Sequence, residues 1–189
     1  MARLRTFIAA DVGKAIRDRL VQLQEKLART GTQVKWVEPE NLHVTLLFLG
    51  EVDDRQIPGV CSIVANETAK HPPFLMAVET VGCFPNLRRP RVLWVGIGQG
   101  MQELCAIHDA LEMPLQELGY RREERRYTPH ITLGRVKSDR ETSPLAEALD
   151  KQAAWRGGEV PVAELLVLSS ELTPKGPVYS VLSRPKLGA

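Results

Sequence analysis

Apolar residues recur every three or four positions in two long segments of the chain. One stripe consists of Ile16, Leu20, Leu23 and Leu27, and the other of Leu104, Ile107, Leu111, Leu115 and Leu118. Residues at this spacing share one face of an α-helix, so each stripe predicts an amphipathic helix. Pro114 lies inside the second stripe and predicts a kink or break near the end of that helix.

Short runs rich in β-branched and other apolar residues predict strands between the helices. These runs cover residues 7–10, 74–81, 94–97, 160–168 and 178–182. Residues 54–70 and 143–153 predict two further helices, the second opened by Ser143 as an N-cap with Pro144 at the first helical position. Strands and helices therefore alternate along the whole chain.

One four-residue pattern occurs twice. His43-Val-Thr-Leu46 and His130-Ile-Thr-Leu133 lie 87 residues apart, and the same offset places residues 7–10 on 94–97 and Gly13 on Gly100. The chain thus reads as a duplication, with repeats of approximately 1–87 and 88–189 within a single bilobal domain spanning residues 1–189. We expect a pseudo-twofold α+β fold in which each repeat has the order β-α-β-α-β. Two mainly antiparallel sheets would face a central cleft, with the helices outside.

Composition is that of an ordinary globular protein. The 189 residues are 43% hydrophobic and 25% charged, with a formal net charge of +2, so charge alone does not indicate nucleic-acid binding. Three cysteines without a CxxC pair indicate reduced thiols rather than a disulfide framework. The sequence contains neither a secretory signal nor an apolar run of roughly 18 residues. We therefore expect a cytoplasmic protein without membrane contact.

The repeated histidine and threonine carry the candidate chemistry. Residues i and i+2 of a strand point to one face, so His43 lies with Thr45 and His130 with Thr132. Two histidines with an ordinary pKa near 6.5 can act as an acid and a base at neutral pH, and threonine hydroxyls can donate to phosphate oxygens. A lone strand histidine is usually structural, but two at matched positions favour a site that attacks a phosphodiester. Neither motif has the ligand spacing of a zinc site, and no serine-hydrolase elbow is present.

Arg135 is a further candidate for holding phosphate. Strict alternation places it with Ile131 and Leu133 on the apolar face. A bend at Gly134 would return its guanidinium to the face of His130, where a planar donor suits a phosphate.

These residues closely resemble the two-histidine phosphoesterases, specifically the RNA 2′,3′-cyclic phosphodiesterases, also called the 2′-5′ RNA ligase family. The similarity runs nearly end to end. It is carried by Arg5-Thr-Phe-Ile-Ala9, Val34-Lys-Trp-Val37, Asn41-Leu-His-Val-Thr-Leu-Leu-Phe-Leu-Gly50, Phe84-Pro85, Pro90-Arg-Val-Leu-Trp-Val95, Tyr127-Thr-Pro-His-Ile-Thr-Leu-Gly-Arg135 and Gly176-Pro-Val-Tyr179. Tyr127 stands where the family often has phenylalanine.

The resemblance implies a hydrolase that needs neither metal nor cofactor and opens a 2′,3′-cyclic phosphate on RNA to a 2′-phosphomonoester. In that family pattern His43 is the proton donor to the departing 3′-oxygen and His130 the proton acceptor from water. Thr45, Thr132 and Arg135 would hold the phosphate. The expected partner is RNA with 2′,3′-cyclic phosphate ends, tRNA-like fragments among them, and the expected state is a monomer.

Basic and aromatic residues are candidates for RNA contacts. Arg88, Arg89 and Arg91 precede the first strand of the second repeat, and Arg3 and Arg5 precede the first strand of the first repeat. Residues 121–126 form another basic run that is equally typical of a solvated loop. Four rings are candidates to stack on a base: Trp36, Phe48, Tyr127 and Tyr179. We expect Tyr127 and Tyr179 in the cleft, whereas Phe48 better suits the core and Trp36 suits either place.

Two alternative functions use the same residues. ATP-independent 2′-5′ RNA ligation is the reverse reaction at the same site, and product analysis on RNA halves would distinguish it. A noncatalytic RNA-end-binding protein would bind without turnover, but the intact motif in both repeats argues against it.

Overall fold

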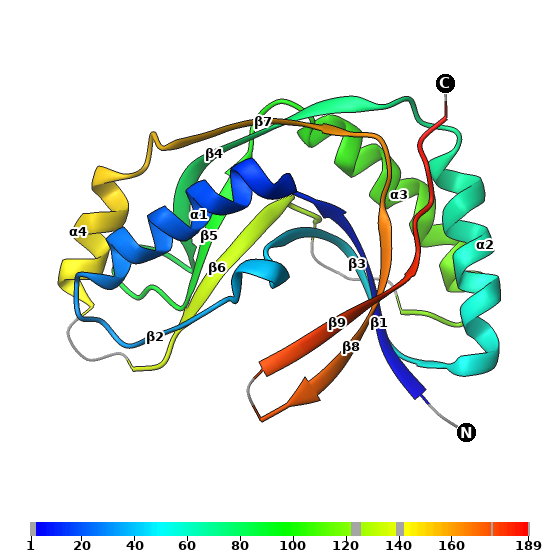
Figure 1. Cartoon of the computed structure of the whole chain (residues 1–189), viewed down its shortest axis with the longest axis horizontal. Helices are drawn as coiled ribbons and strands as arrows, with labels where there is room; N and C mark the ends of the chain where they lie inside the picture. Colours follow the sequence, from blue (N-terminus) through cyan, green and yellow to red (C-terminus); the bar gives the residue numbers. More distant parts are fainter. Residues whose placement is uncertain (1–2, 122–125, 139–141, 175, 189) are drawn as a thin grey trace.

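The computed structural model describes residues 3–121, 126–138, 142–174 and 176–188, and Figure 1 shows their arrangement. The strands are β1 (Arg3–Asp11), β2 (Val34–Trp36), β3 (His43–Asp53), β4 (Phe74–Phe84), β5 (Val92–Ile97), β6 (His130–Val136), β7 (Arg156–Val162), β8 (Leu166–Thr173) and β9 (Gly176–Ser183). The α-helices are α1 (Gly13–Ala28), α2 (Ile57–Thr68), α3 (Met101–Glu117) and α4 (Ser143–Lys151), and two 3₁₀ turns, η1 (Pro39–Asn41) and η2 (Asp54–Gln56), flank β3.

The described strands all pair antiparallel, and they form one nine-stranded sheet in the order β7-β4-β5-β6-β3-β1-β8-β9, with β2 on β6. The α+β class and the antiparallel pairing are confirmed. The expectation of two separate sheets needs correction, because β3 and β6 join the two sets of strands. Across these two strands the joint consists of one residue pair, Val44 opposite Ile131. That pair joins the two sets of strands into one sheet.

The two lobes exchange elements between the sequence halves. The first lobe contains β3, β1, β8 and β9 with α2 and α3, and the second contains β7, β4, β5, β6 and β2 with α1 and α4. Figure 1 shows α1 beside α4 and α3 beside α2. The expectation that each half forms its own sheet is therefore wrong. The short link from Phe84 to Val92 makes β4 and β5 a hairpin, which draws the third strand of the first repeat into the second lobe.

The helices cover one face of the sheet, and the predicted stripes face it. Buried residues include Ile16, Leu20, Leu23 and Leu27 of α1 and Leu104, Ile107, Leu111 and Leu115 of α3. They form one core cluster with sheet residues of both lobes. The α3 helix continues through Pro114 to Glu117, so the expected break does not occur, and Leu118 lies just beyond its end. The two lobes therefore share one hydrophobic core.

The registers around the motif strands show where the duplication departs from a constant offset. Asp11 lies opposite His43, and Gly96 lies opposite His130. The histidines are 87 residues apart, but their partners in β1 and β5 are 85 apart. A residue of β1 therefore corresponds in the structure to the residue 85 positions later in β5, whereas the sequence predicted an offset of 87.

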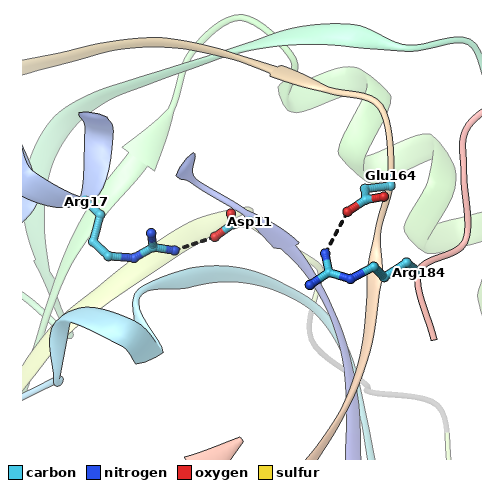
Figure 2. Close-up of polar contacts among 4 residues, drawn as sticks. All are labelled: Asp11, Arg17, Glu164 and Arg184. Carbon is cyan, nitrogen blue, oxygen red and sulfur yellow. Dashed lines mark hydrogen bonds and ion pairs between the residues drawn. The ribbon is translucent and has the colours of Figure 1, made fainter. Parts of the chain in front are cut away.

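One ion pair lies where β8 begins and β9 ends, and three thiols are free. Arg184 donates to Glu164 at 2.8 Å between the ends of β8 and β9 (Figure 2). Cys61, Cys83 and Cys105 are free, and burial raises the pKa of each thiol. Among the described helices, none combines the length and the apolar character required to cross a bilayer.

Candidate active site

The four motif residues surround the pair that joins the lobes. Val44 and Ile131 are fully buried and point toward the helices. Because neighbouring residues of a strand point to opposite faces, the histidines and threonines on either side of this pair point away from the helices. We call that side of the sheet the site face. His43, Thr45, His130 and Thr132 are half-buried there.

Both histidine rings are oriented by a backbone group two residues earlier. His130 Nδ1 lies 2.7 Å from the Thr128 carbonyl oxygen. A carbonyl oxygen only accepts, so Nδ1 carries the proton and Nε2 remains available for the site. His43 also has a hydrogen bond to the backbone of Asn41, and its Nε2 lies 2.9 Å from Thr45 Oγ1. Asn41 and Thr128 are equivalent positions of the two repeats, so the same local geometry presents both rings.

The two histidines differ in their electrostatic surroundings. Burial lowers the pKa of His43 to about 4, against the opposing effects of the Asn41 backbone and the Asp11 carboxylate. Asp11 lies opposite His43 and pairs with Arg17 of α1 at 2.5 Å (Figure 2). Gly96 holds the equivalent place beside His130. An acidic neighbour is therefore present at one histidine and replaced by glycine at the other.

A β-bulge places Arg135 on the site face. Thr132 pairs with Trp94 and Gly134 pairs with Leu93, which leaves Leu133 as an extra residue in β6. The extra residue reverses the alternation, so Leu133 and Gly134 are both buried while Arg135 is exposed. The register thus supplies the change of direction that the sequence suggested at Gly134. Lys35 of β2 lies opposite Arg135, a cation that the sequence analysis missed because only the β2–β6 pairing brings it there.

The same bulge recurs in β3 and exposes Phe48. Ile8 pairs with Leu47 and Ala9 with Thr45, so Leu46 is the extra residue, and Phe48 is the counterpart of Arg135. Its side chain is 53% exposed. The expectation that Phe48 belongs to the core is wrong, because it assumed unbroken alternation. The two sides of the joint therefore present a cation and an aromatic ring at matched positions.

Aromatic rings surround both histidines. The Phe7 and His43 rings stack with 5.1 Å between centroids, and Tyr179 meets His43 edge-on at 5.5 Å. In the second lobe the Phe84 ring lies edge-on to the His130 ring, with 5.4 Å between centroids, and it also contacts the Trp94 ring. Tyr179 therefore lies where the sequence placed it, beside the site. Phe7, Phe84 and Trp94 were missed because strand alternation alone did not separate site-facing rings from core ones.

Tyr127 does not present its ring to a substrate. The ring stacks on the buried His108 of α3, with 4.2 Å between centroids, and its hydroxyl donates to the Thr45 carbonyl oxygen at 2.9 Å. Burial raises the pKa of this phenol. The prediction of a base-stacking role is wrong for Tyr127. The residue instead ties the segment before His130 to the strand of His43.

Two further predicted RNA contacts lie away from the histidines. Trp36 pairs with Gly134, a residue of the buried face, and packs against the main core. Of the two places left open for Trp36 by the sequence, the structure favours the core. Arg91 is exposed one residue before β5, where its backbone bonds both Phe84 and Val136. Residues 122–125 of the predicted basic run lie outside the described residues.

Other features could hold a ligand but lie outside the histidine pair. Within the described residues His108, Asp109 and Glu112 bring potential metal-ligand atoms within 4.8 Å of one another on α3. A pocket of about 650 Å³ lies against Trp94, between the end of α4 and the edge of β4. Its lining is mainly apolar, and neither motif histidine belongs to it.

Two equivalent imidazoles whose Nε2 atoms face the site, flanked by hydroxyls and a guanidinium, suit acid–base chemistry on a phosphate ester. A sequence profile of the LigT-like phosphoesterases matches the chain twice, over residues 11–94 and 95–179. The chain belongs to the LigT-like phosphoesterase family.

Two RNA 2′,3′-cyclic phosphodiesterases are similar in sequence to most of this chain. The RNA 2′,3′-cyclic phosphodiesterase of Methanothermobacter thermautotrophicus is 36% identical over 178 residues, covering 94% of this chain and 96% of that protein. The protein of the same name from Archaeoglobus fulgidus is 37% identical over 179 residues, covering 95% and 98%.

Solved structures agree with the fold. A protein from Thermus thermophilus superposes with a TM-score of 0.82 at 29% identity and covers 97% of each chain. Escherichia coli LigT in complex with 3′-AMP has a TM-score of 0.80 at 25% identity, with 99% of each chain covered.

Proposed function

We propose that this protein hydrolyses the 2′,3′-cyclic phosphate at the end of an RNA, leaving a 2′-phosphomonoester, without a metal ion. The observation that carries the proposal is the pair of equivalent histidines on one sheet face, each ring held by a backbone group two residues earlier and each flanked by a threonine. Relatives named RNA 2′,3′-cyclic phosphodiesterase, 36–37% identical over nearly the whole chain, support the choice of substrate.

In the proposed reaction one histidine takes up a proton and the other releases one. His130 Nε2 takes a proton from water as the water oxygen attacks phosphorus. The bond from phosphorus to O3′ breaks, and His43 gives its Nε2 proton to that oxygen. Histidines on either side of the joint suit attack and departure on opposite sides of phosphorus. Each positioned group contributes about 10²–10⁴ in rate.

Asp11 supports His43 as the donor. An acid must be protonated before the reaction, and the Asp11 carboxylate favours the charged ring. With a pKa of about 4, lowered mainly by burial, His43 is neutral at pH 7 in the free protein. A bound phosphodiester carries a negative charge, which raises the pKa of a histidine within about 4–6 Å. Substrate binding would therefore raise the fraction of His43 that is protonated.

Thr45, Thr132 and Arg135 are the proposed phosphate ligands. The hydroxyls donate single hydrogen bonds, and the guanidinium can donate two in one plane. Thr45 Oγ1 also lies 2.9 Å from His43 Nε2. When substrate binds, the Thr45 hydroxyl can exchange this hydrogen bond for one to a phosphate oxygen.

Opening of a nucleoside 2′,3′-cyclic phosphate by purified protein tests the proposal. His43→Ala and His130→Ala should each lose at least about a hundredfold in kcat. His71→Ala is the matched control, since His71 lies outside the site. Full activity in either motif variant overturns the acid–base assignment, and a 3′-phosphate product overturns the stated regiochemistry.

Metal independence has its own measurement. Activity should survive exhaustive treatment with EDTA. Loss of activity on chelation with recovery on adding a divalent ion would instead direct attention to His108, Asp109 and Glu112.

A further inference from the structure

The site face of the first lobe continues far beyond the histidine pair. The counterpart of Phe7 in the second lobe is Val92, where β5 begins, and β6 ends at Val136. In the first lobe, by contrast, β1 starts at Arg3 and β3 ends at Asp53. The β8–β9 hairpin pairs alongside to Thr173 and Gly176 and projects from the body in Figure 1. Within the part of the chain that the structure describes, this extension has no equivalent in the other repeat.

Registers define which side chains lie on this extension. Cross-strand partners share a face, so one row runs through Phe48, Phe7, Leu168 and Val181. The next row away from His43 runs through Glu51, Arg5, Ser170 and Tyr179. Ring contacts of Phe7 with Phe48 at 5.7 Å and with Tyr179 at 4.9 Å agree with this assignment. We call these two rows the platform.

The exposed groups of the platform are aromatic, aliphatic and charged. Phe48 is 53% and Val181 45% exposed, Arg5 is exposed and Tyr179 half-buried. Phe7 is buried although none of the described helices covers it, because His43, Phe48 and Tyr179 pack around its ring. Glu51 is the acidic member of the second row, and it lies opposite Arg5.

We propose that the platform binds the single-stranded RNA that precedes the cyclic phosphate, with Phe48 stacking on a base and Arg5 contacting a backbone phosphate. This inference rests on the proposed function. If His43 protonates O3′, the terminal ribose lies on the His43 side of phosphorus, and the strand leaves the site in the direction of Phe48. Exposed rings beside a cation are the elements with which single strands are bound irrespective of sequence.

Besides the pairing of β1 with β3, one buried residue links the β9 side of the platform to the segment that precedes β3. The Asn41 side chain donates from Nδ2 to the Pro177 carbonyl oxygen of β9 at 2.9 Å, and its backbone holds the His43 ring. Asn41 is itself buried. RNA bound on the platform would therefore be held at a fixed position relative to His43.

Substrate length tests the inference. Kinetics would be compared on a nucleoside 2′,3′-cyclic phosphate and on a short oligoribonucleotide with the same end. Phe48→Ala should raise KM for the oligonucleotide about tenfold, because base stacking on an aromatic ring contributes that order of affinity. The mononucleotide should be affected less than about twofold. Val178→Ala is the control, since Val178 is an equally exposed neighbour of Tyr179 on the opposite face of β9.

Salt dependence tests the cation separately. Arg5→Gln should weaken oligonucleotide binding and reduce the slope of log affinity against log salt by about 0.7, the value for one phosphate contact on a single strand. Arg29→Gln, an exposed arginine at the end of α1, should leave the slope unchanged.

The outcomes separate this inference from the proposed function. Equal losses on both substrates, or no loss on the oligonucleotide, overturn the platform. If wild-type protein opens neither substrate, the proposed function fails. In that case, binding of the same labelled oligonucleotide, measured by fluorescence anisotropy, tests the platform by itself. Equal affinities of wild type and Phe48→Ala overturn the platform.

Discussion

Val44 and Ile131 lie opposite each other in the residue pair that joins β3 to β6, and they are the same position of the two repeats. An antiparallel pair of equivalent residues is related by a local twofold axis that passes between them. Everything that flanks Val44 is therefore repeated around Ile131, which is how two copies of one motif become a single site. The exceptions to the symmetry, Asp11 against Gly96 and Phe48 against Arg135, distinguish the two sides.

Tyr127→Phe should lower the free energy of unfolding by about 1 kcal/mol, because it removes the hydrogen bond to the Thr45 carbonyl oxygen. It should also lower kcat, since that bond holds the strand of His43 against the segment before His130. Chemical denaturation and steady-state kinetics measure the two effects. Tyr120→Phe is the matched control, because its buried hydroxyl has no hydrogen-bond partner among the described residues, and this variant should be as stable as wild type or more so. A Tyr127 variant as stable and active as the control would contradict the assignment.

Acid should destabilise the protein partly through His43. Its pKa is about 4 when folded and about 6.5 when unfolded, so between these values the unfolded chain binds more protons. The resulting stability is present above pH 6.5 and is lost as the pH falls toward 4, by about 3 kcal/mol in all. Urea unfolding at pH 7 and pH 4.5 would measure it.

His43→Gln isolates that contribution, because glutamine has no titration in this range while the other groups still titrate. The variant should lose less stability than wild type over the same pH interval. Parallel losses in the two proteins would show that the His43 environment does not drive the acid response.

Arg135→Gln should lower kcat/KM for the cyclic phosphate by about 10- to 100-fold, the effect of removing hydrogen bonds from a charged donor to phosphate. Arg135→Lys should recover part of this loss, since lysine keeps the charge but not the planar pair of donors. Unchanged kinetics in both variants would remove Arg135 from the proposed site.

Gly82→Ala should destabilise the protein by about 1–3 kcal/mol, because a Cβ at Gly82 would lie 2.4 Å from Trp94 Cζ2 and force that ring to move. Since Trp94 packs on Phe84 beside His130, activity should fall as well. Gly59→Ala is the control, as no described atom lies within 4 Å of its Cβ position in α2, and the change should stabilise by up to about 1 kcal/mol. Equal melting temperatures of the two variants would refute the steric argument.

Local patterns predicted much of the fold and the centre of the candidate site. The stripes of α1 and α3 were sufficient to identify both helices, because a helix buries residues at a fixed spacing. The alternation around His43 and His130 placed each with its threonine for the same reason in strands. Predictions failed where alternation was interrupted, as at Phe48. They also failed at Tyr127, whose ring stacks on His108 while its hydroxyl donates to Thr45.

The sequence by itself determined that the chain is duplicated, that each repeat presents a histidine and a threonine on one strand face, and that the family is one of phosphoesterases. Tertiary structure decided which rings and cations join them. Bulges at Leu46 and Leu133, the Asp11–His43 register and the exchange of β4 and β8 between lobes all depend on pairings between distant segments. Such pairings are selected by the packing of the whole sheet against its helices, and no local sequence pattern records that energy.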